Sequence, residues 1–462
     1  MLASCVHSTH RNGWRAPAQT LHRGWVCNGR VAILEPAMKK YPLTLTLLLG
    51  VLVPLACWLA VTGVPADYWG WRRMVVMVSG VGLAALIGAC ALLAVRPGWL
   101  ERSLGGLDKL YALHKRFGIA CALMLGVHWL TELSPKLFLA LEWAAPKVRK
   151  AGGVKDPLMS LAKDMGEWAA WGMLAMVLVA LLSAIPYRWW RPSHRLFAPL
   201  VLMGAWHGLM LFDGRLWAGP AGVLFAAILA VSVYAALMSL FGRIGRKRRH
   251  AGQIVSLERL PGGTLDILCK ADGWPGHTAG QFALVTFDKR EGAHPFTIAS
   301  APRPGGELRF IVKALGDYTA TLADTLHAGD ALLVEGPYGG FVAGQGQGRQ
   351  AWVAGGIGVT PFLAWLEARG RTGGTGEVDF YYCVKDAGEA AALEEVRERA
   401  RASGVCLHLV ESAKGGRFDP ACLADASDVY FCGPPRLGEA IEAALSARGR
   451  AAHFHHEAFA MR

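Results

Sequence analysis

This sequence is poor in charge and has no clustered cysteines. Asp, Glu, Lys and Arg make up 18% of its 462 residues, whereas hydrophobic residues make up 53% and the mean hydropathy is +0.30. Because an ordinary soluble protein is less hydrophobic, we expect a membrane part joined to a soluble part. The ten cysteines are scattered without a CxxC pair. This argues against a disulfide framework, a zinc site and an iron–sulfur cluster.

The first 37 residues lack the apolar core of a signal peptide. Met38, Lys39 and Lys40 are followed by an apolar run and resemble a natural start. We therefore expect residues 1–37 to be a disordered or untranslated extension. An intact mass that includes Met1 would contradict this expectation.

The net charge of +13 raises the question of nucleic acid. The basic residues cluster instead beside apolar segments, as at Arg243 and from Arg246 to Arg249. Retention of positive charge in the cytoplasm and contact with anionic lipid explain this clustering more simply. With no recognition module in the sequence, we expect membrane lipid, and not nucleic acid, as a partner.

Long apolar runs dominate the first half of the chain. They lie at about 43–64, 74–95, 112–133, 167–187, 195–213 and 216–241. Each is long enough to span a bilayer, and none has a charged residue at its centre. This predicts a six-helix transmembrane domain over residues 38–245. The loop charges favour a plasma (inner) membrane location with cytoplasmic termini, and residues 132–166 are expected to lie on the outer surface.

Histidine is rare in this half, and only four occur between Pro42 and Arg248. They are His114, His128, His194 and His207. Ionisable groups at membrane depth are costly, so each is a functional candidate. A 14-residue spacing brings the first two within about 40° of one helix face. The 13-residue spacing of the second two gives a divergence of about 140° on an ideal helix, unless Pro199 kinks it.

Two such helices running the same way would pair His114 with His194 near the inner surface, and His128 with His207 near the outer surface. Bis-imidazole ligation of two b-type haems requires this arrangement. The alternative is a set of isolated core histidines bonded to backbone carbonyls. Two pairs at these spacings favour haem.

The pattern changes after Arg249. Residues 250–347 contain short alternating segments, such as 253–257 and 282–287, between Gly and Pro turns, which predicts an antiparallel β-barrel. Residues 348–462 alternate strands with helices, which predicts a parallel α/β domain with a nucleotide crevice at the strand ends. Strands are expected at 351–354, 378–384, 405–410 and 428–432, and helices at 361–368, 390–402 and 437–447.

Two turns in this α/β domain are candidate binding elements. Residues 355–361, with sequence GGIGVTP, follow a strand and precede a helix, where backbone N–H groups can approach a pyrophosphate. A tight turn without a ligand is an equal alternative. Residues 432–435, with sequence CGPP, end a later strand where the crevice should be, although a simple strand-ending turn has the same form.

Several motifs together resemble the ferric reductase and NADPH oxidase superfamily. They are the segment 294–300 (HPFTIAS), the loop 355–361, the CGPP turn, the tail Glu457-Ala458-Phe459 and the two histidine spacings. The resemblance covers about residues 42–462. More narrowly, the chain resembles bacterial ferric-reductase-like proteins that are built from one polypeptide. This resemblance implies a six-helix bundle fused to a ferredoxin-reductase-like module, with an FAD-binding β-barrel and an NAD(P)H-binding α/β domain.

The resemblance also implies roles for individual residues. FAD should contact His294, Pro295, Phe296 and Thr297, with its pyrophosphate held by Lys313, Gly316, Tyr318 and Thr319. The nicotinamide nucleotide should contact Gly355, Gly356, Gly358, Val359, Thr360 and Pro361, with Cys432, Gly433 and Pro434 near the nicotinamide. Phe459 should stack on the flavin. Ser412, Lys414 and Arg417 suit the 2′-phosphate of NADPH, although solvated loop charges are an equal explanation.

We therefore expect electron transfer from cytoplasmic NADPH or NADH through FAD and two b-type haems to oxygen or a ferric chelate at the outer face. Two alternatives stay open. One is a membrane-anchored flavin reductase without haem. The other is an electron-relay subunit that reduces a periplasmic or extracellular partner.

Overall fold

The computed structural model describes residues 42–146, 156–181, 187–344, 348–374, 376–450 and 453–457. The predicted extension 1–37 and the candidate Phe459 lie outside these described residues. The first part of the chain is helical. Its helices are α2 (Pro42–Thr62), α3 (Tyr68–Val95), α4 (Gly98–Leu104), α5 (Leu107–Ala140), α6 (Pro157–Leu181), α7 (Tyr187–His194), α8 (Phe197–Leu211) and α9 (Pro220–Leu240).

Among the described helices, α2, α3, α5 and α9 are long and apolar enough to cross a membrane. The other two predicted spans correspond to α6 and α8, which differ for separate reasons. The 15 residues of α8 extend over only about 22 Å, less than a hydrocarbon core of about 30 Å. The first turns of α6 carry Lys163, Asp164 and Glu167. Four spans are thus supported, and six remain a proposal.

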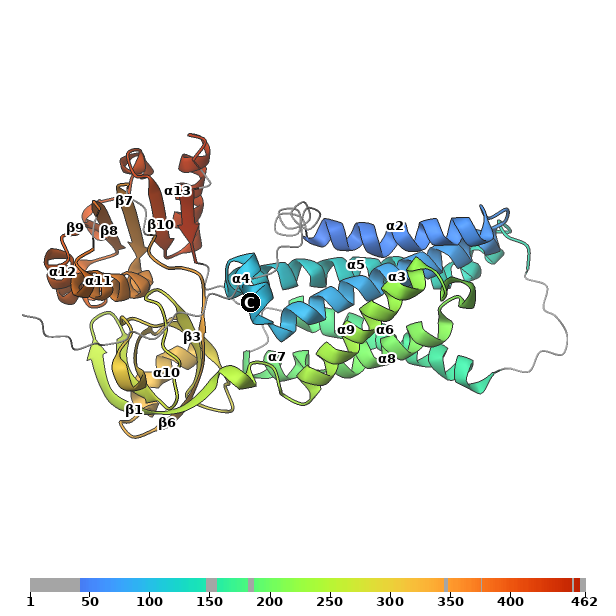
Figure 1. Ribbon diagram of the computed structural model, residues 1–462, viewed down its shortest axis with the longest axis horizontal. Coiled ribbons are helices and arrows are strands. Elements are labelled where there is room, and N and C mark those ends of the chain that lie inside the picture. The colour runs from blue at the N-terminus through green and yellow to red at the C-terminus, as the bar shows by residue number, and fades with distance from the viewer. Residues whose placement is uncertain are drawn as a thin grey trace, which may run out of the picture. The chain divides into compact units, whose positions relative to one another are not determined.

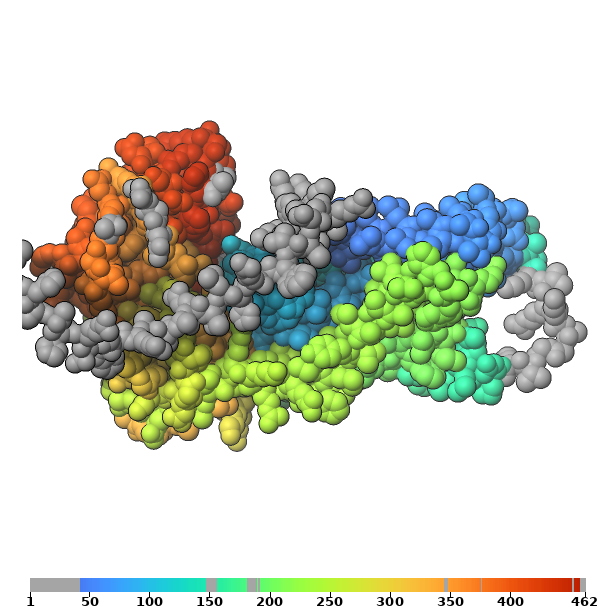
Figure 2. All heavy atoms as spheres, viewed as in Figure 1, coloured from blue at the N-terminus to red at the C-terminus, as the bar shows by residue number. Residues whose placement is uncertain are grey.

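Small residues let α3 pack closely in the centre of the bundle (Figure 1). A Cβ atom on Gly50 of α2 would lie 2.8 Å from the Cβ of Ala85, and one on Gly88 would lie 2.9 Å from the Oγ of Ser232 in α9. Such close backbone approach is typical of helices that associate in lipid. On the outside, Figure 2 shows the side chains of α2 and α9 at the surface, where Leu52 and Val223 are exposed. Exposed apolar side chains of this kind suit contact with hydrocarbon.

The second part of the chain begins with a six-stranded antiparallel sheet of order β4-β3-β6-β1-β2-β5. Its strands are β1 (Arg249–Leu260), β2 (Thr264–Ala271), β3 (Phe282–Thr286), β4 (His294–Thr297), β5 (Glu307–Lys313) and β6 (Ala331–Tyr338). An isolated antiparallel bridge between Ile298 and Phe310 joins the two edges at one point. The helix α10 (Asp317–Thr325) follows β5. The antiparallel prediction is confirmed, whereas closure into a barrel remains a proposal.

A five-stranded parallel sheet of order β11-β10-β7-β8-β9 follows. Its strands are β7 (Gln350–Gly355), β8 (Val378–Val384), β9 (Cys406–Glu411), β10 (Asp428–Cys432) and β11 (Phe454–His456). Helices α11 (Thr360–Thr372) and α12 (Leu393–Ala402) pack on one face, and α13 (Pro435–Ser446) packs on the other (Figure 1). Consecutive residues of a strand point to opposite faces of the sheet. Because Trp352 and Val353 are both buried, both faces of β7 are covered.

Ion pairs join the helical part to the antiparallel sheet. Arg96, which caps α3, lies 2.9 Å from Glu335 of β6, and Arg249 lies 2.7 Å from the other carboxylate oxygen. Arg248 lies 2.8 Å from Glu101 of α4, and its guanidinium lies 4.8 Å from the ring centroid of Tyr338. Arg248 and Arg249 belong to the basic cluster that was expected to stay on the cytoplasmic side of the membrane and to contact anionic lipid. Their carboxylate partners give them a structural role at this junction as well.

Candidate functional site

The four membrane histidines form two pairs. The ring centroids of His114 and His194 are 6.1 Å apart, and those of His128 and His207 are 6.4 Å apart. His194 ends α7, whereas His207 lies on α8. The helix breaks between them at Arg195 and Leu196, which removes the constraint that a 13-residue spacing imposes on one continuous helix.

The break lies just before Pro199, in agreement with the expected interruption, because a proline lacks an N–H and its ring crowds the carbonyl of the residue four positions earlier, here Arg195. Pro199 lies in the first turn of α8, three residues after the break. A proline is tolerated in the first turn because the N–H group that it lacks has no intrahelical acceptor there.

Hydrogen bonds fix the protonation pattern of three of the rings. The Nδ1 of His114 lies 3.0 Å from the carbonyl oxygen of Cys90, and that of His207 lies 2.9 Å from the carbonyl oxygen of Ala162. The Nδ1 of His128 lies 3.0 Å from the Oγ of Ser79. A carbonyl oxygen only accepts, so Nδ1 carries the proton and Nε2 keeps its lone pair. Histidines that ligate metals are oriented in this way.

Carbonyl bonding was also the hallmark of the alternative, in which the histidines are isolated core residues. What separates the two interpretations is the pairing, because isolated core histidines have no reason to face one another across two helices. Glycines make room for the rings. A Cβ on Gly166 would lie 2.0 Å from the Nδ1 of His207, and one on Gly80 would lie 3.1 Å from the Cε1 of His128. On α5, Gly118 lies one turn after His114, and a Cβ there would meet nothing within 4 Å.

The predicted flavin-contacting residues lie on β4 and at the start of α10. The rings of His294 and Tyr318 are stacked at 4.7 Å, and Thr297 is buried. Burial raises the pKa of Tyr318 to about 12, so its phenol stays neutral at physiological pH. Pro295 pairs with Leu284 of β3, and Phe296 packs against the core of the antiparallel sheet.

The start of α10 offers fewer phosphate donors than the sequence suggested. The Oγ1 of Thr319 accepts hydrogen bonds from the N–H groups of Leu315 and Gly316, at 3.0 and 3.1 Å. The N–H of Gly316 is therefore engaged within the turn. The first-turn N–H groups of Asp317 and Tyr318 have no intrahelical acceptor and are the ones oriented for an anion.

A small pocket of about 30 Å³ lies between the end of β5 and the ends of β7 and β8. Its lining includes Lys313, Gly356, Ile357, Val384 and Lys385. Lys313, assigned from sequence to the flavin pyrophosphate, thus faces the same pocket as the glycine loop. Lys385 was missed, although it directly follows the predicted strand 378–384. Asp386 and Glu389 also line the pocket, so its two lysines are balanced by two acidic side chains.

The glycines of the two loops divide into two groups. Added Cβ atoms on Gly355, Gly358 and Gly433 would lie between 2.1 and 2.9 Å from atoms of the facing loop. These three glycines allow the ends of β7 and β10 to touch. Gly356 differs, because it has a φ of +55° and nothing within 4 Å of an added Cβ. Val359, Thr360 and Pro361 are buried at the start of α11. Gly356 is the loop glycine with room for a ligand.

Cys432 ends β10 and is fully buried. Burial, followed by the nearby charge of Glu457, holds the pKa of its thiol well above the usual value. Glu457 is 5% exposed, and neither carboxylate oxygen has a hydrogen-bond partner within the described residues. Burial likewise raises the pKa of Glu457 well above its usual range. Sequence reasoning quoted Glu457 as part of a tail motif but gave it no role.

The residues predicted to favour NADPH are exposed at the end of β9. The Nζ of Lys414 lies 2.9 Å from Glu411, and Ser412 and Arg417 are also exposed. Lys414 is thus paired with Glu411 at an exposed edge of the sheet.

The family model described as "Ferric reductase like transmembrane component" matches residues 79–205, and the model described as "FAD-binding domain" matches residues 251–341. The reductase component of propane 2-monooxygenase from Rhodococcus jostii (strain RHA1) is 27% identical over 193 residues, covering 37% of this chain and 52% of the relative. The ferredoxin–NAD(+) reductase component of an alkene monooxygenase system from Xanthobacter autotrophicus is 27% identical over 212 residues, covering 42% and 64%. The chain thus spans about half the length of the first of these relatives.

Among solved structures, a flavohemoglobin from Malassezia yamatoensis is 17% identical, with 84% of this chain and 98% of that chain covered. Its TM-score of 0.46 is too low to indicate a shared fold. The two family matches are different in kind, because they fall in order on the two parts described above. A ferric-reductase-like helical part followed by an FAD-binding part is the architecture of the ferric reductase and NADPH oxidase superfamily, and this chain belongs to that superfamily.

Proposed function

We propose that this protein is an NAD(P)H-dependent oxidoreductase that moves electrons across the plasma membrane to an acceptor at the outer face. The acceptor class is molecular oxygen, which would give superoxide, or a ferric chelate. When bound, FAD and two b-type haems supply the hydride acceptance and the single-electron chemistry. The protein's own contribution is to bind and orient these groups and to keep their surroundings dry.

The observation that carries this proposal is the separation of the paired histidine rings. Two imidazoles that ligate opposite sides of one metal ion, with bonds of about 2 Å, have centroids about 6 Å apart. The separations of 6.1 and 6.4 Å are close to this value. The Nδ1 hydrogen bonds leave Nε2 as the ligand atom in His114, His128 and His207. His114 with His194, and His128 with His207, are the proposed axial ligands.

The soluble half supports the electron-donor side. Lys313 and Lys385 line a small pocket beside Gly356, together with Asp386 and Glu389, and the two lysines are proposed to contact the phosphates of a dinucleotide. His294 to Thr297, Tyr318 and the first turn of α10 are proposed to hold the flavin. Cys432, Gly433 and Pro434 are proposed to lie near the nicotinamide, with Phe459 against the flavin. Burial raises the pKa of Glu457 well above the usual carboxyl range.

The test is haem stoichiometry in the full chain purified in detergent, measured from the dithionite-reduced absorption spectrum. The expected content is two haems in the wild type and about one in either His114→Leu or His128→Leu. His250→Leu is the matched control, because the Nδ1 of His250 also bonds a carbonyl oxygen, at 3.0 Å, but the ring lies in β1. Yellow protein without haem bands would contradict the proposal and support a haem-free flavin reductase.

Electron flow is tested by anaerobic addition of NADPH or NADH to the wild type, His114→Leu and His128→Leu. The wild type should reduce both haems. His128→Leu should still reduce its remaining haem but lose reduction of the acceptor, whereas His114→Leu should show slow haem reduction. Reoxidation by air with superoxide formed in proportion favours an oxidase, and reoxidation mainly by ferric chelate favours a ferric reductase.

A second candidate function is electron relay to a protein partner. It is favoured by the two relatives, which are named as reductase components of monooxygenases. A relay predicts that reduced protein is reoxidised slowly by air and by ferric chelate, and rapidly only after a periplasmic extract is added. Rapid reoxidation by either small acceptor would exclude it.

A further inference from the structure

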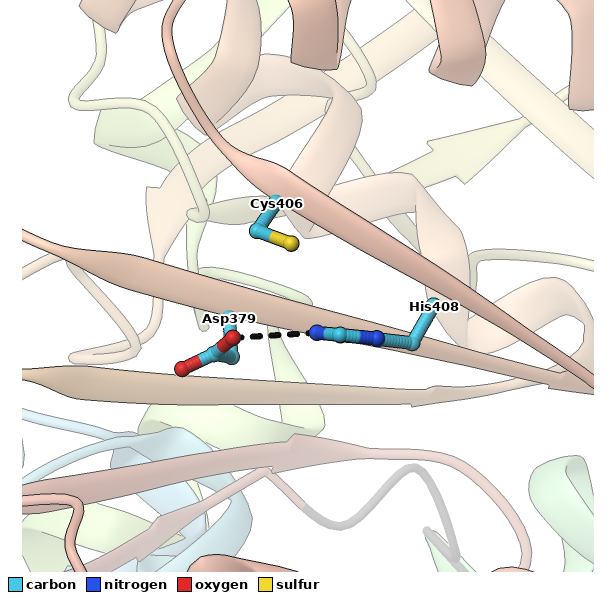
Figure 3. A group of neighbouring side chains, drawn as sticks. All are labelled: Asp379, Cys406 and His408. Atoms are coloured by element: carbon cyan, nitrogen blue, oxygen red, sulfur yellow. Dashed lines mark hydrogen bonds and ion pairs between the residues drawn. The ribbon is translucent and has the colours of Figure 1, made fainter.

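Three potential metal ligands meet at the edge of the parallel sheet. In the register of β8 with β9, Asp379 pairs with Cys406 and Tyr381 pairs with His408, so Asp379, Cys406 and His408 share one face. Their ligand atoms all lie within 4.8 Å of one another, and Figure 3 shows the three side chains converging. They lie at the starts of the two strands, the opposite edge of the sheet from the pocket at Val384 and Lys385.

We propose that Asp379, Cys406 and His408 form a binding site for a divalent transition-metal ion, with Zn²⁺ as the best match. A thiolate, an imidazole and a carboxylate are the three side-chain ligands that Zn²⁺ uses in proteins. Sequence reasoning argued against a zinc site because the chain has no CxxC pair. The C-x-H pattern at 406–408 gains its third ligand only from the neighbouring strand, 27 residues earlier.

The geometry needs little adjustment. The Nε2 of His408 lies 3.0 Å from the Oδ1 of Asp379. Zinc bonds of about 2.0 to 2.3 Å place neighbouring ligand atoms about 3.3 to 3.6 Å apart. Cys406 is exposed, so its side chain is free to rotate toward the other two. A solvent molecule would complete four-coordination on this open side.

Arg349 supports the site and does not block it. Its Nε donates to the Oδ2 of Asp379 at 2.6 Å, which leaves Oδ1 directed at His408. Hydrogen bonding to the second carboxylate oxygen is how outer residues orient a carboxylate ligand. One thiolate and one carboxylate also balance the charge of a divalent ion.

The competing explanation is an ordinary surface ion pair among Arg349, Asp379 and His408. The same sheet contains a comparison for it, because His455 and Asp428 form a similar pair at 2.8 Å. None of the described cysteines is grouped with that second pair. Cys406 takes no part in either ion pair, and it is the residue that distinguishes a metal site from a charge pair. Metal binding would clamp β9, the edge strand of the sheet, to β8.

The test uses the full chain, loaded with haem and FAD so that the membrane histidines are occupied. Thiols are alkylated with a maleimide with and without Zn²⁺, and each cysteine is followed by peptide mass spectrometry. Zn²⁺ should slow alkylation of Cys406 by about tenfold or more, because a coordinated thiolate is a poor nucleophile. Cys422, the other exposed cysteine of the described residues, should be unaffected.

Two variants complete the design. His408→Ala should abolish the protection and remove about one bound Zn²⁺ per chain, measured by elemental analysis after gel filtration. His455→Ala, which breaks the comparison pair, should keep both. Equal protection in His408→Ala, equal slowing at Cys422, or unchanged zinc content would overturn the proposal. None of these residues is assigned to NAD(P)H oxidation. A failure of NAD(P)H oxidation would therefore contradict the proposed function and leave the zinc proposal unaffected.

Discussion

Glu335 in the antiparallel sheet and Glu457 beside the parallel sheet are each 5% exposed, but their surroundings differ. Glu335 lies between Arg96 and Arg249 and accepts the hydroxyl of Tyr338 at 2.8 Å. Glu457 has no hydrogen-bond partner among the described residues. The pKa of Glu335 is lowered, because the two arginines and Tyr338 together outweigh its burial. The pKa of Glu457 is raised, with burial as the main cause. Equal burial thus goes with pKa shifts in opposite directions, according to the partners of each carboxyl.

Three of the membrane histidines resemble Glu335 in having hydrogen-bond partners that orient their side chains. The largest expected effect comes from filling the space that the imidazole ring of His207 occupies beside Gly166. Gly166→Val would place Cβ 2.0 Å from the Nδ1 of His207. The ring must then leave the carbonyl of Ala162, and we expect haem content to fall from two to about one per chain.

Absorption spectra of the reduced protein measure this change. Gly126→Ala on α5 is the control, since an added Cβ there meets nothing within 4 Å. Full haem content in Gly166→Val would mean that His207 is not positioned by this contact.

The second effect is on the junction of the two parts. Glu335→Gln leaves Arg96 buried without its counter-charge, and breaking a buried pair in this way costs about 3 to 5 kcal/mol. The free energy of unfolding in detergent should fall by that order. The exposed Glu258 on β1 gives the control Glu258→Gln, which should change stability by less than about 0.5 kcal/mol.

The pH dependence of the Glu335 pair has a definite sign. Because the pKa of Glu335 is lowered in the folded protein, its contribution is present above the ordinary carboxyl pKa near 4.5. It is lost as pH falls through the lower folded value. The gap between wild type and Glu335→Gln should therefore close on acidification below about pH 4.5. A gap that is constant with pH would show that the carboxylate charge is not the cause.

The third prediction reverses the second. Glu457→Gln replaces an unpartnered acid with a neutral group of the same shape, so it should stabilise the protein at neutral pH. Since the folded pKa is raised, the wild type loses stability as pH rises from about 4.5 toward the folded value. The advantage of Glu457→Gln should grow over this range. Thermal midpoints at a series of pH values measure it, and a loss of stability in Glu457→Gln would show a missing partner for the carboxylate.

How far sequence predicted these features depends on how local each one is. The pairing of His114 with His194, and of His128 with His207, was expected from two histidine-bearing helices running the same way, but the 13-residue spacing fits it only because the helix breaks after His194. The parallel and antiparallel sheets follow from strand patterns. An interruption near Pro199 was expected, but the sequence did not show that the helix would stop completely at Arg195 and Leu196. The two arginine partners of Glu335 are more than 80 positions away, and periodicity carries no information about them. The same holds for Asp379 and His408, which meet only through strand register.

The smallest effect tests what sets the state of Glu457. Lys109, near the start of α5, lowers the pKa of this carboxyl, whereas burial and Asp108 raise it. Lys109→Met removes the one opposing charge, so the pKa of Glu457 should rise further. Infrared difference spectra can follow the protonated carboxyl band, identified by its absence in Glu457→Gln. Its loss should shift to higher pH in Lys109→Met and stay unchanged in Lys270→Met, an exposed lysine of β2. An unchanged titration in Lys109→Met would mean that Lys109 does not contribute to the pKa of Glu457, which burial and Asp108 would then set.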